Sequence, residues 1–145
     1  ESCTKRKAGC FYSPEKAAQF EQAGIRVWAI GSPIGKYQIA DDFEPHLKDF
    51  RRALEVCKAL GTKRMRMFSF FTKQDELSVH RDEVIRRLKI MLEEAAAAGV
   101  TLCHENESKI YGQNPEEVEE LLHHDEIIQC LHAAPLWRYM ARYPF

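Results

Sequence analysis

The most reactive stretch of the sequence is residues 101–107, which read Thr-Leu-Cys-His-Glu-Asn-Glu. If a strand here continues to Glu105, side-chain alternation places Cys103 and Glu105 on one face and His104 on the other. A carboxylate at the end of a strand suits a hard or borderline divalent metal such as Mg²⁺ or Mn²⁺. It also suits a base that removes a proton alpha to a carbonyl. One carboxylate and one histidine do not complete a metal site, so a solvated loop is the alternative interpretation.

A second candidate is residues 31–36, Gly-Ser-Pro-Ile-Gly-Lys. Backbone N–H groups and the Lys36 ammonium could hold a hydroxyl-rich or phosphorylated ligand. The spacing does not match a P-loop, because Tyr37 follows Lys36 where that motif has Ser or Thr. A turn with a solvated lysine therefore stays open as an interpretation. Arg66 lies in a predicted strand. Its side chain would lie either in a polar layer inside a barrel or near the solvent-exposed end of that strand.

These segments follow a repeating unit. Gly24, Gly61 and Gly99 are separated by 37 and 38 residues, and each lies between an amphipathic run and a short apolar run. The pattern predicts helices at about 14–23, 43–60 and 81–98, a fourth helix after Asn114, and strands at 25–30, 64–70 and 100–103. Strands that alternate with helices predict parallel βα units, in either a doubly wound sheet or a (β/α)8 barrel. Both folds place their chemistry beyond the carboxyl ends of the strands, where the two candidate segments fall.

The predicted helices carry apolar stripes at helical spacing, which indicate the side that packs on the sheet. We expect the core to include Leu47, Phe50, Leu54, Val84, Leu88 and Leu92.

Composition limits the class of protein. The chain has 145 residues, a length that fits one domain. Its formal net charge of −1 predicts neither a nucleic-acid partner nor a membrane partner. Five scattered cysteines without a C-x-x-C pair predict reduced thiols. The N-terminal residues contain no apolar run typical of a secretory signal, so the expected compartment is the cytoplasm.

Several motifs together resemble one family, the sugar phosphate isomerases/epimerases of the xylose isomerase-like TIM barrel superfamily. The matching segments are residues 32–36, the 43–54 helix, Arg-Met-Phe-Ser-Phe at 66–70, residues 81–84, and residues 99–112 with the Cys-His-Glu-Asn-Glu run. The resemblance covers about residues 20–122, whereas residues 1–12 and 125–145 match nothing in the pattern. It implies a single partial domain over residues 1–145, about half of a (β/α)8 barrel, with three parallel strands and four helices.

The resemblance also implies a site. Family members bind a divalent metal, most often Mn or Mg, with Zn or Co as other possibilities, through Glu, Asp, His and Glu at four strand ends. The first of these positions falls on Glu105, which would both bind the metal and exchange the proton at a sugar carbon beside a carbonyl. By position, Ser32, Lys36, His104 and Asn106 would contact the sugar or its phosphate.

The later ligands have no counterpart in this sequence, so we expect any metal to be weakly bound and the isolated chain to show little or no turnover. Two alternatives follow: a non-catalytic half-barrel that persists as an oligomerising module, and an abasic-site endonuclease, which the near-neutral charge disfavours. An incomplete barrel leaves strand edges open. We therefore also expect a homo-oligomer, or edges covered by the aromatic tail that contains Trp137, Tyr139, Tyr143 and Phe145.

Overall fold

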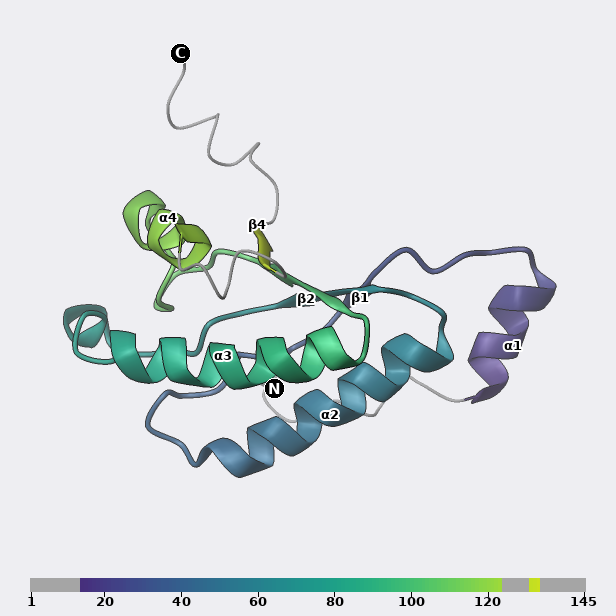
Figure 1. Ribbon diagram of the computed structural model, residues 1–145, viewed down its shortest axis with the longest axis horizontal. Helices are drawn as coiled ribbons and strands as arrows, with labels where there is room; N and C mark the ends of the chain where they lie inside the picture. Colours follow the sequence, from purple (N-terminus) through teal and green to yellow (C-terminus); the bar gives the residue numbers. More distant parts are fainter. Residues whose placement is uncertain (1–13, 124–130, 134–145) are drawn as a thin grey trace, which may run out of the picture.

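The computed structural model describes residues 14–123 and 131–133 (Figure 1). The predicted aromatic tail lies outside these residues. In chain order, the elements are α1 (Pro14–Gln22), β1 (Ile30–Gly31), α2 (Phe43–Ala59), β2 (Arg64–Met67), the 3-10 helix η2 (Gln74–Glu76), α3 (Arg81–Ala97), β3 (Thr101–His104), α4 (Pro115–His123) and β4 (Leu131–Ala133). None of the described helices has both the length and the apolar character needed to cross a membrane.

The strands form one parallel sheet in the order β1-β2-β3-β4. The three predicted strands are therefore adjacent and parallel, as the sequence indicated. The fourth strand was not predicted: β4 has three residues, pairs with β3 among the described strands, and lies beyond the segment that resembles the family.

The first two strands are shorter than predicted; the register explains the difference in β1, and the backbone conformation of Phe70 explains the difference in β2. Ile30 pairs with Met65, so residues 25–28 would run past the start of β2, where the chain is still turning at Gly61. At its other end, β2 stops before Phe70, whose φ of 66° is incompatible with an extended strand.

The helix boundaries agree with the prediction to within one residue where both ends were predicted. Asp42 caps α2 by accepting the Glu44 N–H at 3.3 Å. Glu117 forms a capping box at the start of α4 by accepting the backbone N–H of Asn114 at 3.4 Å. The three repeat glycines all have positive φ, as the left-handed position after a helix requires.

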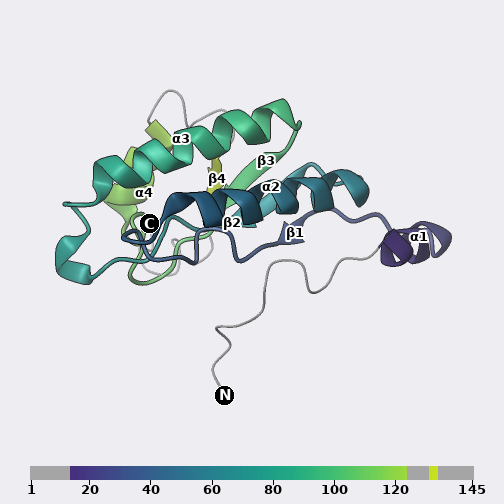
Figure 2. The ribbon, with the colours of Figure 1, turned by 90° about the horizontal axis from the view of Figure 1, so that it is seen from below.

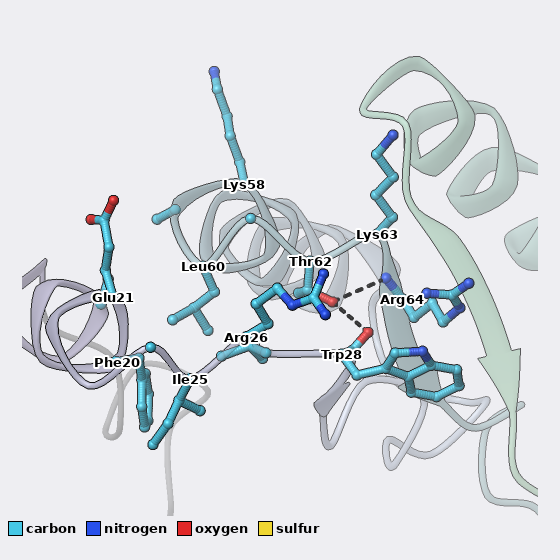
Figure 3. A pocket seen from close by; sticks show the side chains of 15 residues that line it. Phe20, Glu21, Ile25, Arg26, Trp28, Lys58, Leu60, Thr62, Lys63 and Arg64 are labelled. Carbon is cyan, nitrogen blue, oxygen red and sulfur yellow. Dashed lines mark hydrogen bonds between the residues drawn. The ribbon is translucent and has the colours of Figure 1, made fainter.

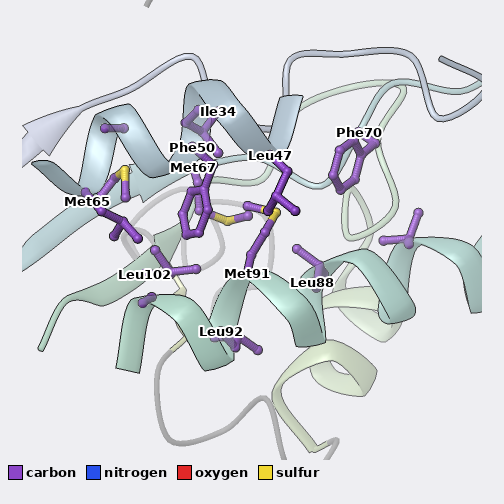
Figure 4. Close-up of a cluster of buried hydrophobic side chains, with 14 of the residues drawn as sticks. Ile34, Leu47, Phe50, Met65, Met67, Phe70, Leu88, Met91, Leu92 and Leu102 are labelled. Atoms are coloured by element: carbon purple, nitrogen blue, oxygen red, sulfur yellow. The ribbon is translucent and has the colours of Figure 1, made fainter. Parts of the chain in front are cut away.

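The hydrophobic core lies between the sheet and the helices (Figure 4). Figures 1 and 2 show α2 and α3 side by side along one face of the sheet, and Leu121 of α4 belongs to the same core. A doubly wound sheet would carry helices on both faces. The one-sided arrangement instead corresponds to part of a barrel. All six predicted core residues are buried: Leu47, Phe50, Leu54, Val84, Leu88 and Leu92.

The two faces of the sheet differ in chemistry. Met65, Met67 and Leu102 are buried against the helices, whereas their neighbours in β2 and β3 are half-buried on the other face. We call this second face the polar face; it carries Arg64, Arg66, Thr101 and Cys103.

Candidate functional site

The loop after β1 lies directly against the end of β2. Phe68 N–H donates to Ile34 O at 2.8 Å, and Phe70 N–H donates to Gly35 O at 2.9 Å. Gly35 has a φ of 85°, and a Cβ there would lie 1.9 Å from Phe68 O. Only glycine permits this approach, which brings the loop that carries Lys36 to the carboxyl ends of the strands.

Glu105 lies at the carboxyl end of β3, on the polar face. Its N–H donates to Met67 O at 2.9 Å, so the ladder continues one residue beyond the strand. Arg66 reaches it from β2, with 3.0 Å between Arg66 Nη1 and Glu105 Oε2. Arg66 Nη2 also donates to Ser32 O at 3.2 Å. The guanidinium thus joins the ends of three neighbouring strands.

A second ion pair lies beside the first. Lys36 Nζ is 2.8 Å from Glu107 Oε2 and 4.3 Å from the centre of the Phe68 ring. The same ring lies 5.0 Å from Arg66 Cζ. The charged side chains are between 34% and 40% exposed, so a ligand can reach both pairs. We call this group the strand-end cluster; its members are Ser32, Lys36, Arg66, Phe68, Glu105 and Glu107.

Ser32 belongs to the cluster through its hydrogen bonds. The buried Ser32 hydroxyl donates to Arg66 O, and Ile34 N–H donates to Ser32 Oγ at 3.3 Å. The hydroxyl therefore ties the loop after β1 to the strand that carries Arg66. Asn106, which the sequence also selected, follows Glu105 and is half-buried.

His104 lies away from the cluster, on the face that packs against the helices. Its ring is buried, and Nε2 is 2.9 Å from Ser69 Oγ. Because the Ser69 hydroxyl donates to Tyr111 O, His104 Nε2 is the donor to Ser69. Burial lowers the pKa of His104 to about 4, so the ring is neutral near pH 7. The structure thus separates His104 from Glu105, as strand alternation predicted.

The sequence reasoning missed three members of the cluster as site residues: Arg66, Phe68 and Glu107. It also missed His46, a buried side chain of α2 whose Nε2 accepts Gly35 N–H at 2.9 Å. Burial, and to a lesser extent the charge of Arg87, lowers the pKa of His46 to about 4. The available signal was a histidine beside Leu47 on the apolar face of a predicted helix.

The cluster does not fit a resident divalent metal. Within residues 14–123 and 131–133, no three His, Cys, Asp or Glu side chains converge on a point that could hold an ion. Both cluster carboxylates already face a cation, Glu105 facing Arg66 and Glu107 facing Lys36. Metal sites for Mg²⁺ or Mn²⁺ need several oxygen donors with a surplus of negative charge, which this cluster lacks.

A large hollow of about 1020 Å³ lies at the other end of the sheet, before β1 and β2 (Figure 3). It lies between α1 and the turn after α2. Its apolar lining includes Phe20, Ile25, Trp28 and Leu60, and its basic lining consists of Arg26, Lys58, Lys63 and Arg64. Arg64 Cζ lies 4.4 Å from the Trp28 ring. No residue of the strand-end cluster lines this hollow.

Comparisons with known proteins place the fold. The sequence model of a family described as xylose isomerase-like TIM barrel matches residues 12–126. A search of curated proteins gave no significant match.

Three solved structures illustrate the similarity. A probable 3-DHS dehydratase from Bacillus anthracis has a TM-score of 0.68 at 15% identity, over 83% of this chain and 43% of its own. The 3-keto-D-glucoside 4-epimerase from E. coli has a TM-score of 0.64 at 18% identity, over 82% of this chain and 51% of its own. A xylose isomerase-like TIM barrel protein from Mycobacterium smegmatis, solved in complex with magnesium, has a TM-score of 0.63 at 17% identity, over 86% and 47%. The chain therefore spans about half the length of these proteins.

Proposed function

The chain belongs to the xylose isomerase-like TIM barrel family, and we propose that it acts on a sugar or sugar phosphate as an isomerase or epimerase. One observation carries the proposal: the Glu105 carboxylate lies on the polar face at a strand end, beside two cations that a ligand can reach. A dehydratase and an epimerase share this fold, so the fold alone does not select the reaction. The proposal therefore rests on the chemistry of the strand-end cluster.

In the proposed reaction, Glu105 removes and returns the proton at the carbon beside the sugar carbonyl. Lys36 binds a phosphate or hydroxyl oxygen, and Asn106 contributes an amide to the same ligand. Ser32 and His104 support the site from behind, because both side chains are buried and hydrogen-bonded within the protein. The divalent metal that the family resemblance implies does not fit the described donors, so no step of the proposed reaction depends on it.

The test is exchange of the substrate α-proton with deuterated water, followed by NMR over a panel of sugars and sugar phosphates. Exchange needs only a base and a bound substrate, so it is a more sensitive readout than turnover. Glu105→Gln should abolish exchange. The matched control Glu93→Gln removes an exposed carboxylate from α3 and should leave exchange intact. The proposal would be contradicted if no sugar or sugar phosphate of the panel showed either binding or proton exchange.

The second candidate function is a non-catalytic, self-associating module. It is favoured by β1, which is an edge strand among the described strands, and by three large apolar side chains near it: Phe20, Ile25 and Trp28 are 38%, 54% and 70% exposed. Exposed apolar patches and open edges are typical of surfaces that pair with another chain. The free thiols of Cys57 and Cys103 support the cytoplasm as the compartment for either function.

A further inference from the structure

We infer that Arg66 is the resident counter-cation of Glu105 and occupies the role that a divalent metal would have at this carboxylate. The inference rests on the proposed function only in taking Glu105 as the carboxylate that reacts. It assigns a new residue, because the sequence pattern gave Arg66 no place in the site.

The guanidinium is held in position from three strands. It pairs with Glu105, the residue after β3, at 3.0 Å and donates to the carbonyl oxygen of Ser32, the residue after β1, at 3.2 Å. It lies 5.0 Å from the Phe68 ring. Gly31 of β1 lies beside it: a Cβ at that position would be 3.5 Å from Arg66 Nη2, an ordinary van der Waals contact. The Arg66 carbonyl is itself bound by the Ser32 hydroxyl, so both ends of the residue are anchored to the same loop.

This anchoring opposes a metal at Glu105. The guanidinium already places one positive charge beside this carboxylate. A dication bound to Glu105 would lie within a few ångströms of the guanidinium and would be repelled by it. The neighbouring Lys36–Glu107 pair adds no surplus negative charge. With two cations and two carboxylates, the four charged groups of the cluster sum to zero.

The same geometry supplies an alternative to metal assistance. When Glu105 takes the proton, the C–H bond breaks and its electron pair moves toward the carbonyl, which becomes an enediolate oxygen. An anchored guanidinium beside the carboxylate can donate hydrogen bonds to that oxygen as its negative charge develops. The carboxylic acid of Glu105 then returns the proton to carbon, and no further reactant is needed. Arg66 is thus a metal-independent electrophile for the proposed reaction.

The inference is tested by Mn²⁺ binding to the full 145-residue chain, followed by electron paramagnetic resonance. The wild-type protein should show no saturable binding below millimolar Mn²⁺. Arg66→Met frees Glu105 and should tighten binding at least about tenfold, which is about 1.4 kcal/mol. Adding Glu105→Gln to Arg66→Met should remove the gain.

Arg64→Met is the matched control. It removes the same charge from the same strand and face, but from an arginine that stacks on Trp28 and does not pair with Glu105. It should leave Mn²⁺ binding as in the wild type. Equal effects of the two variants, or tight wild-type binding that Glu105→Gln abolishes, would overturn the inference.

If circular dichroism shows that Arg66→Met does not fold, a second measurement keeps the inference testable. Relative to the wild-type protein, the Glu105→Gln variant should show a shifted NMR resonance of the Arg66 guanidinium, whereas the Glu93→Gln variant should not. An unchanged resonance would contradict the pairing. The two proposals fail separately. If proton exchange in the substrate requires added Mn²⁺, only the role of Arg66 is overturned. If Arg66→Met binds Mn²⁺ more tightly but no sugar exchanges its proton, only the proposed function is overturned.

Discussion

His46 of α2 accepts the backbone N–H of Gly35 at 2.9 Å, and through this bond a helix holds the loop that carries Lys36. The bond requires an unprotonated Nε2, because a protonated ring nitrogen cannot accept a hydrogen bond. The arrangement of the strand-end cluster therefore depends on a buried histidine that stays neutral.

The first prediction is a loss of stability in mild acid. The pKa values of His46 and His104 are lowered from 6.5 to about 4, in both cases chiefly by burial. Between these values the unfolded chain binds protons that the folded chain does not, so the free energy of unfolding rises with pH. Each histidine contributes up to about 1.4 kcal/mol per pH unit between pH 4 and pH 6.5, and nothing further above that range.

Urea denaturation at a series of pH values measures this slope. The carboxylate of Glu83, whose pKa is lowered to about 2 by its hydrogen bonds from Arg86 and Arg87, loses its stabilising effect only below its unfolded value of 4.5. The interval from pH 4.5 to 6.5 therefore separates the effect of the two histidines from that of Glu83. His104→Asn should reduce the slope by about half, and a flat profile in the wild-type protein would contradict the prediction.

The second prediction concerns Gly35. Gly35→Ala places a Cβ 1.9 Å from Phe68 O, whereas Gly61 has a similar left-handed φ and no atom within 4 Å of an added Cβ. Gly61→Ala should cost only the backbone strain, about 1–2 kcal/mol. Gly35→Ala should cost about 1–3 kcal/mol more, because the neighbouring strand must move. Equal melting temperatures for the two variants would show that the loop is not packed against β2.

The third prediction concerns the core. Leu88 of α3 is fully buried, so Leu88→Ala should lower the free energy of unfolding by about 2–5 kcal/mol in urea titrations. Glu93→Ala, at an exposed position of the same helix, should change it by less than about 0.5 kcal/mol. If Leu88→Ala lowered the free energy of unfolding by less than about 0.5 kcal/mol, the predicted apolar stripe of α3 would face solvent.

The fourth prediction is that the protein self-associates through the surface at the β1 edge of the sheet. Light scattering should give a mass above the 16.8 kDa of one chain, rising with protein concentration. Trp28→Ser removes the most exposed of the three large apolar side chains near β1 and should shift the protein toward the monomer. A wild-type monomer at every concentration would count against the self-associating module.

Local patterns in the sequence determined much of this protein. The three repeat glycines adopt the left-handed conformation expected after a helix, and the predicted apolar stripes of α2 and α3 are buried. Strand alternation placed Glu105 and His104 on opposite faces. These features were predictable because each depends on the backbone conformation of a few consecutive residues, or on the period of one helix or strand.

Only the tertiary structure decided which of these residues meet. The Arg66–Glu105 pair joins side chains 39 positions apart, and the contact between Gly35 and His46 joins a loop to a helix face. Among the described strands β4 pairs with β3, and its three residues are too few to show a strand period of their own. Pairing across a sheet depends on register between distant segments, which the periodicity of a single segment does not contain. For this reason the sequence identified the carboxylate at the end of β3, while the folded chain alone set an arginine beside it.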